Sequence, residues 1–153
     1  MNILKLPPYY YPEVISSSHL TKDLEEAYSQ AGFNSIVFTP TPTRGISDAV
    51  YKEYKDITYE ERYDGHIQVH RFPMFREGRN PIGRVIRYVL VHWKQYGKAV
   101  KEPDIAIISA GSTPPTQGML SALVAKKLSK KYKRKVPFIY NLQDIFPDSL
   151  VST

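Results

Sequence analysis

Cysteine is absent from this chain of 153 residues, and this absence excludes disulfide bonds and thiolate metal sites. It fits a reducing compartment, so we expect a cytoplasmic location, with a peripheral position at the inner face of the membrane left open. Residues 1–8 lack the long apolar core of a secretory signal peptide. The longest apolar stretch, residues 85–93, is interrupted by Arg87 and His92, so no membrane-spanning segment is expected.

Glycine is missing where a nucleotide-binding loop would need it. Residues 13–19 read Glu-Val-Ile-Ser-Ser-Ser-His and contain no G-x-G-x-x-G motif, which excludes a site for a whole dinucleotide. Ser16, Ser17 and Ser18 are candidates for substrate contact through backbone and hydroxyl groups, and they are equally suited to cap the helix that follows. His19, at the helix start, is a further candidate, although a lone histidine is more often a surface residue.

Positive charge is concentrated in residues 126–135, which we call the basic segment. The formal net charge is +6, and without this segment the chain would be close to neutral. Its simplest interpretation is a solvated helix end, where cations stabilise the helix dipole. The alternative is contact with an anionic membrane surface, through Lys126, Lys127, Lys130, Lys131 and Arg134. Nucleic acid is not expected as a partner, because Tyr132 is the only aromatic residue available for stacking on bases.

Helix and strand periodicities alternate along the sequence. Strands are expected at residues 3–6, 35–39, 65–72, 104–108 and 136–142, the last of them buried. Helices are expected near residues 20–31, at 80–101 and from the Pro114-Pro115 pair to about 132, whereas residues 43–65 are predicted to be irregular. This order predicts one α/β domain spanning residues 1–153, with a Rossmann-like, doubly wound and mostly parallel sheet.

For two of the predicted helices, the periodicity indicates which residues share a face. In the first, Leu20, Leu24, Ala27 and Tyr28 are expected to face the sheet and Glu25 to face the solvent. The helix at residues 80–101 has a wide apolar stripe surrounded by basic residues. The stripe consists of Ile82, Val85, Ile86, Val89, Leu90 and Trp93. Such a helix either packs on the sheet or lies in a membrane interface, and the sequence leaves both open.

Ligands of doubly wound sheets bind at the carboxyl ends of the strands. This rule selects the loops at residues 7–18, 109–113 and 143–148. Ser109, Gly111 and Ser112 are small residues that either leave room for a substrate or form a tight turn before a helix. Asp144 is a candidate catalytic carboxylate, and its type also allows it to cap the next helix.

Four segments together resemble the N-terminal half of a GT-B glycosyltransferase of the retaining family-four type. They are Tyr-Tyr-Tyr-Pro-Glu at 9–13, Ala-Gly-Phe-Asn-Ser-Ile-Val at 31–37, the Pro-Asp-led strand at 103–109, and Gln-Asp-Ile-Phe-Pro-Asp-Ser-Leu at 143–150. The last is close to the Asp-x-x-Pro-Glu-Ser signature of a subgroup that builds surface polysaccharides. The resemblance covers nearly the whole chain.

The resemblance implies a two-domain transferase of which this chain is the acceptor-side domain. The implied donor is a nucleotide sugar, held mainly by a C-terminal domain that is not part of this sequence, and the implied acceptor is lipid-linked or a polysaccharide. Asp144 stands where many relatives carry a histidine or aspartate facing the donor sugar. No cofactor and no metal is implied. The alternatives are a flavodoxin-like module, which would need paired acidic residues after the first strand, and a binding module with a basic surface.

Overall fold

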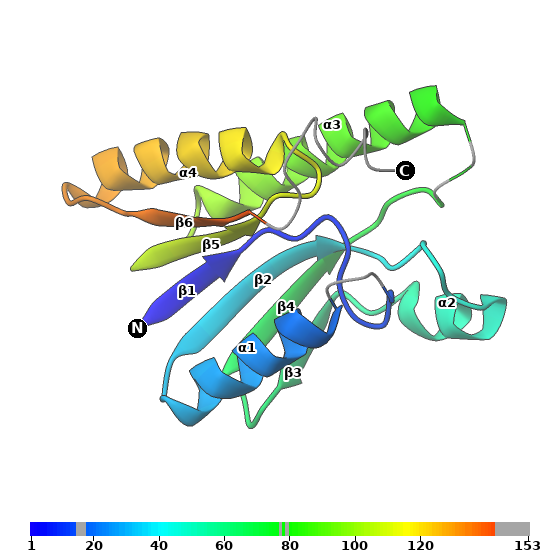
Figure 1. The fold of residues 1–153 in the computed structure, drawn as a ribbon, viewed down its shortest axis with the longest axis horizontal. Coiled ribbons are helices and arrows are strands. Elements are labelled where there is room, and N and C mark those ends of the chain that lie inside the picture. The colour runs from blue at the N-terminus through cyan, green and yellow to red at the C-terminus, as the bar shows by residue number, and fades with distance from the viewer. Residues whose placement is uncertain (15–17, 77, 79, 143–153) are drawn as a thin grey trace.

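The computed structural model of this chain describes residues 1–14, 18–76, 78 and 80–142 and has an α/β architecture (Figure 1). Its elements are β1 (Asn2–Lys5), α1 (Ser18–Gln30), β2 (Asn34–Pro40), α2 (Asp48–Tyr54), β3 (Tyr59–Arg62), β4 (Ile67–Phe72), α3 (Pro81–Ala99), β5 (Ile107–Gly111), α4 (Gln117–Tyr132) and β6 (Phe138–Asn141). The expected alternation of strands and helices is therefore confirmed.

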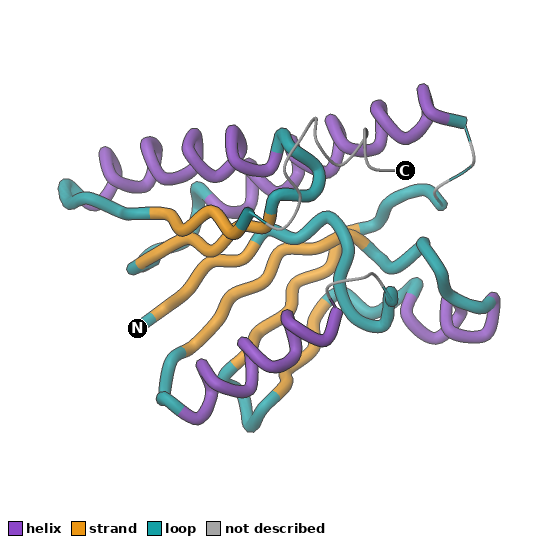
Figure 2. Tube along the Cα trace, in the orientation of Figure 1, coloured by secondary structure: helices purple, strands orange, loops and turns teal. Residues whose placement is uncertain are grey.

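The six strands form one sheet in the order β3-β4-β2-β1-β5-β6. All neighbouring pairs are parallel except β3 and β4, so the prediction of a mostly parallel sheet is confirmed. Helices lie on both sides of the strands, with α1 on one face and α3 and α4 on the other (Figure 2). In chain order, β2 and β4 are placed on one side of β1, and β5 and β6 are then placed on its other side. The point of reversal therefore falls between β1 and β5.

The larger apolar core lies between the sheet and the helices α3 and α4. Its buried members are Leu4, Leu6, Phe38, Ala99, Ile105, Ile108, Leu120, Val124, Ala125, Leu128 and Val136. A smaller buried cluster contains Tyr10, Val37, Ile67 and Val69. Val37 and Phe38 belong to different clusters because successive strand side chains point to opposite faces. Burying each large apolar side chain contributes about 1.5–3 kcal/mol to folding.

Residues 43–65 are not irregular, so this prediction is wrong. They contain α2, capped by the Ser47 side chain, and the antiparallel strand β3. The turn between β3 and β4 has positive φ angles at Tyr63, Asp64 and Gly65. Asp and Gly tolerate this left-handed conformation better than most residues, so the Asp-Gly pair permits the reversal.

Two strands differ from the prediction, β5 in its residue range and β6 in its burial. β5 begins at Ile107, so Ser109 and Gly111 lie in the strand itself, whereas we expected them in the loop after it. β6 is not the buried strand that its apolar residues indicated. It is the edge strand of the sheet, and Phe138 and Ile139 are 39% and 54% exposed. No further strand covers it within the described residues, and its apolar side chains remain open to solvent.

Candidate functional site

A pocket of about 1110 Å³ lies at the carboxyl ends of β1 and β5, where the sheet reverses its winding. The loop after β1 forms one wall with the aromatic side chains of Tyr9, Tyr10 and Tyr11. The first turns of α1 and the end of β5 line other parts of it. This is the position where open α/β sheets bind their ligands, so the pocket is the candidate site.

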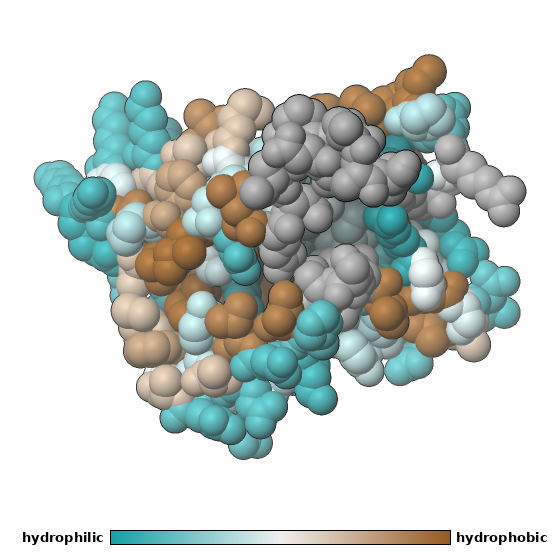
Figure 3. All heavy atoms as spheres, in the orientation of Figure 1, coloured by the Kyte–Doolittle hydropathy of each residue, from teal (hydrophilic) through white to brown (hydrophobic). Residues whose placement is uncertain are grey.

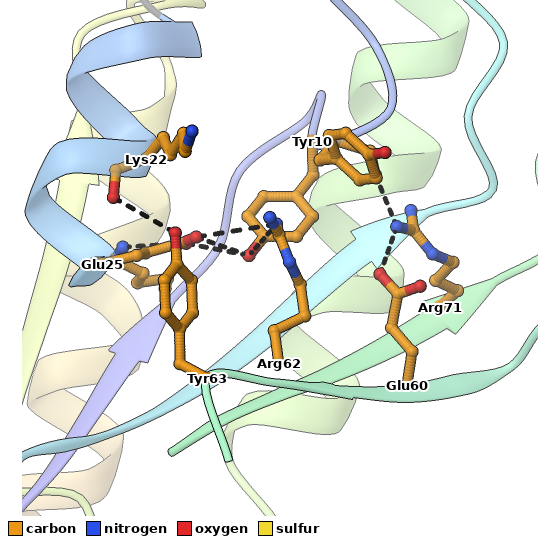
Figure 4. Close-up of polar contacts among 9 residues, drawn as sticks. Tyr10, Lys22, Glu25, Glu60, Arg62, Tyr63 and Arg71 are labelled. Atoms are coloured by element: carbon orange, nitrogen blue, oxygen red, sulfur yellow. Dashed lines mark hydrogen bonds and ion pairs between the residues drawn. The ribbon is translucent and has the colours of Figure 1, made fainter. Parts of the chain in front are cut away.

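Charged side chains from three elements meet beside the pocket (Figure 4). Glu25 of α1 is only 1% exposed, and its carboxylate lies 3.1 Å from Nζ of Lys5 on β1. The hydroxyl of Tyr10 donates to Glu25, 2.9 Å from each carboxylate oxygen. Arg62 of β3 lies 3.8 Å from the same carboxylate and donates to the Tyr10 hydroxyl. We call Lys5, Tyr10, Glu25 and Arg62 the polar cluster.

The polar cluster has one carboxylate for two cationic groups. Burial lowers the pKa of Lys5, and the Glu25 carboxylate acts in the opposite direction. Burial also raises the pKa of the Tyr10 hydroxyl, with Glu25 adding to this shift, so Tyr10 stays protonated and donates. Burial disfavours the charged form of Arg62, but Tyr10 and Glu25 outweigh it and raise its pKa. The Arg62 guanidinium therefore keeps its positive charge beside the pocket.

Glu13 holds the loop after β1 in place. Its carboxylate accepts hydrogen bonds from the backbone N–H groups of Tyr10 at 3.1 Å, Thr43 at 2.7 Å and Arg44 at 2.8 Å. Burial raises the pKa of Glu13, and these three N–H donors oppose the shift. Because the contacts join the loop to residues after β2, Glu13 is a positioning residue for the wall of the pocket.

The predicted site residues are only partly brought together. His19 of α1 and Ser109 and Gly111 of β5 all line the pocket. Ser18 is the first residue of α1, and Ser112 is buried directly after β5 but is not part of the lining. The predictions for Ser16, Ser17 and Asp144 lie outside the described residues.

Two members of the basic segment have structural partners. The Lys131 ammonium group donates to the carbonyl oxygens of Val100, Lys101 and Glu102, 2.7–3.1 Å away, and so neutralises the end of α3. Arg134 donates to Asp104 at 2.6 Å and to the carbonyl of Ile105 at 3.0 Å. Lys126, Lys127 and Lys130 are exposed on α4. A membrane contact of the segment stays a prediction.

Sequence reasoning missed the polar cluster, and it assigned the faces of α1 wrongly. Glu25 is the buried residue of the described part of this helix, whereas Leu20 and Leu24 are 44% and 38% exposed and line the pocket. The physical reason is that Glu25 meets the cation of Lys5. A lysine inside an otherwise apolar strand was the available signal, because a buried lysine needs a nearby carboxylate.

No family model matches the sequence, and no curated protein matches it with significance. Among the described residues, no group of three or more histidine, aspartate or glutamate side chains could hold a metal ion. In the same part of the chain, no helix has both the length and the apolar character needed to cross a bilayer. The assignment of a function therefore depends on the pocket and on the residues around it.

Proposed function

We propose that this chain is the acceptor-side domain of a retaining glycosyltransferase with two Rossmann-like domains. In this proposal the enzyme moves a sugar from a nucleotide donor to a lipid-linked or polysaccharide acceptor, and the second domain holds most of the donor. The observation that carries the proposal is the pocket at the reversal point of the sheet, where its aromatic wall meets the positively charged Arg62 of the polar cluster.

The lining of the pocket suits a saccharide that bears a phosphate or pyrophosphate group. Tyr11 is 54% exposed and offers a ring on which the C–H face of a sugar can pack. The guanidinium of Arg62 lies 4.7 Å from the centre of this ring, and that of Arg44 lies 5.1 Å from the Tyr9 ring. Arginine is well suited to phosphate recognition because its planar donors match the oxygen geometry.

The residues proposed for the reaction have separate tasks. His19, Ser109 and Gly111 line the space for the acceptor, and Gly111 leaves room there because it has no side chain. Asp144 is proposed to face the donor sugar, on the strength of the resemblance. Catalysis requires both substrates to be held in reactive geometry, so the 153-residue chain alone is expected to have no transferase turnover.

Titration of the isotopically labelled chain with two ligands tests this division of labour. A water-soluble pyrophosphoryl oligosaccharide is expected to shift the backbone amide resonances of Tyr11, His19 and Gly111, because these residues line the pocket. A nucleotide sugar alone is expected to bind weakly and to remain intact. Hydrolysis or transfer by this chain alone, or tight nucleotide-sugar binding with no saccharide response in the pocket, contradicts the proposal.

A further inference from the structure

Helix α3 faces the sheet with polar side chains. Arg87 and Gln95 are fully buried on its inner side, and His92, between them in sequence, is half-buried. The outer side exposes five large apolar residues, each between 51% and 71% exposed: Ile82, Val85, Ile86, Val89 and Trp93. Apolar side chains follow α3 along the upper edge of the molecule in Figure 3. A helix on a sheet normally shows the reverse arrangement, so the inner polar side chains need partners of their own.

Two glutamines hold the chain where it leaves β1. The amide of Gln95 on α3 donates to the carbonyl oxygens of Pro7 and Phe38, both at 2.9 Å. The amide of Gln117, the first residue of α4, donates to the carbonyl oxygen of Leu6. Both glutamines are at most 1% exposed, and Gln117 lines the pocket. The consecutive carbonyl groups of Leu6 and Pro7 are therefore fixed by α4 and α3, directly before the aromatic wall of the pocket begins.

His92 connects Gln117 to α3. Its Nε2 lies 3.1 Å from Oε1 of Gln117, and its Nδ1 lies 2.6 Å from the carbonyl oxygen of Tyr88. The orientation of the Gln117 amide is fixed, because only its NH₂ group can donate to the Leu6 carbonyl. Its oxygen must therefore face His92. Both ring nitrogens of His92 thus face oxygen atoms that can only accept hydrogen bonds.

We propose that His92 positions the wall of the pocket as an imidazolium ion, through Gln117 and the Leu6 carbonyl. We call these three groups the His92 relay. A neutral imidazole has one N–H group and would leave one of the two oxygens facing a nitrogen lone pair, whereas an imidazolium donates to both. The inference rests on the proposed function in one respect, because the wall that His92 positions is that of the proposed acceptor site.

The surroundings of the ring leave the relay to His92 itself. Within the described residues, the ring makes no ion pair and no hydrogen bond besides those to Gln117 and Tyr88. The inner side of α4 carries no charged residue, and its lysines are exposed. From the loop after β1, the Tyr9 hydroxyl contacts the Tyr88 hydroxyl at 3.1 Å, one turn away from His92. Histidine changes its charge between about pH 5 and 8, so pH acts on the relay through His92 in this range.

The ring nitrogens of His92 test the proposal without any ligand. Near neutral pH, long-range ¹H–¹⁵N spectra of the labelled chain are expected to show two protonated nitrogens for His92. The His92 signals are assigned by their loss in His92→Gln. A His92 ring with a single protonated nitrogen near neutral pH overturns the proposal.

A pH profile separates positioning from a merely structural contact. Raising the pH from about 6 to about 9 is expected to shift the backbone amide of Leu6 and the side-chain amide of Gln117 in the wild type. His92→Gln should abolish this response, because its amide donates to Gln117 at every pH. His19 also lines the pocket and can titrate, so the profile is repeated with His19→Gln, which should keep the response. A response lost in His19→Gln but kept in His92→Gln overturns the proposal.

Affinity for a water-soluble pyrophosphoryl oligosaccharide supplies the rescue test. His92→Leu is expected to weaken binding by about fivefold, the effect of one lost hydrogen bond, and His92→Gln should restore it. His66→Leu is the matched control, because His66 contacts Asn34 at the amino ends of β2 and β4, away from the pocket. Equal losses in His92→Leu and His66→Leu, or no rescue by glutamine, overturn the proposal.

The ring measurement uses no saccharide, so its failure is distinguishable from failure of the proposed function. A chain with a neutral His92 ring whose pocket responds to the saccharide loses only the His92 relay. A chain with an imidazolium at His92 whose pocket ignores the saccharide loses only the transferase proposal.

Discussion

Replacing Glu25 with leucine is expected to destabilise the fold by about 3–5 kcal/mol, because it leaves a buried cation without its carboxylate. Lys5 is 8% exposed and lies 3.1 Å from Glu25. The substitution also removes the acceptor of the Tyr10 hydroxyl. Urea unfolding followed by circular dichroism measures the loss. Glu26→Leu, at an exposed neighbouring position on α1, is the matched control and should change stability by only about 0.5 kcal/mol.

The penalty of Glu25→Leu should shrink as the pH rises. Burial already lowers the pKa of Lys5, and the variant lacks the Glu25 interaction that opposes this shift. Between the lowered pKa and the ordinary lysine value, the folded variant binds fewer protons than its unfolded chain, so its stability increases with pH in this window. The double variant Lys5→Met, Glu25→Leu should recover much of the loss. A penalty that is small at neutral pH and independent of pH contradicts a buried ion pair.

Gly111→Val is expected to lower the activity of the proposed two-domain transferase by about a hundredfold, since displacement of a substrate by about 1 Å has an effect of this size. Gly111 lines the pocket at the end of β5, and a Cβ built on it meets no atom within 4 Å. The added side chain therefore occupies pocket space without a clash in the protein. Valine also suits a strand, so the melting temperature should stay close to that of the wild type.

Gly97→Val is the matched control for this substitution. A Cβ on Gly97 also has no neighbour within 4 Å, but this glycine lies on α3 and does not line the pocket. The control should retain wild-type activity. Valine is a weaker helix former than most residues, but glycine is weaker still, so the substitution should change stability little. If Gly111→Val retains full activity, the acceptor does not occupy the pocket beside β5.

The arrangement of the sheet could be predicted because its signals are local. Apolar runs bounded by proline and glycine mark the strands, and helices between them require parallel strands with crossover connections. The position of the pocket also follows from the sequence, because the loops after β1 and β5 must meet at the carboxyl edge. His19, Ser109 and Gly111 were selected in this way, and all three line the pocket; their role in binding stays a prediction.

The polar cluster could not be derived from periodicity, because its members are joined only by the tertiary fold. Lys5, Glu25 and Arg62 lie on β1, α1 and β3. The apolar strand around Lys5 indicates that a carboxylate lies nearby but not which one, and Glu25 and Arg62 would each be assigned to a solvated face. Their burial depends on one another, since an isolated buried charge is unfavourable. The ion pair also decides which face of α1 is buried. Glu25 turns inward to reach Lys5, so Leu20 and Leu24 lie at the pocket instead of in the core.

The orientation of α3 on the sheet could not be predicted from the sequence either. Its apolar periodicity is plain in the sequence, but the stripe alone does not tell whether it faces the sheet or the outside. The deciding contacts come from Gln95 and Arg87, whose partners at Pro7, Phe38 and Thr43 are distant in sequence. The missed strand β3 is a different case, because the Asp64-Gly65 pair before an alternating strand is a hairpin signal that the sequence does contain.

Sugar transfer by the full-length gene product is the most direct test of the acceptor-domain proposal. The enzyme is incubated with a panel of labelled nucleotide sugars and with membrane lipids as acceptors, and the configuration of the new glycosidic bond is determined by NMR. We expect one nucleotide sugar to label a lipid-linked product with its anomeric configuration retained. Absence of transfer from every donor to lipid and polysaccharide acceptors, or a product of inverted configuration, would contradict the account.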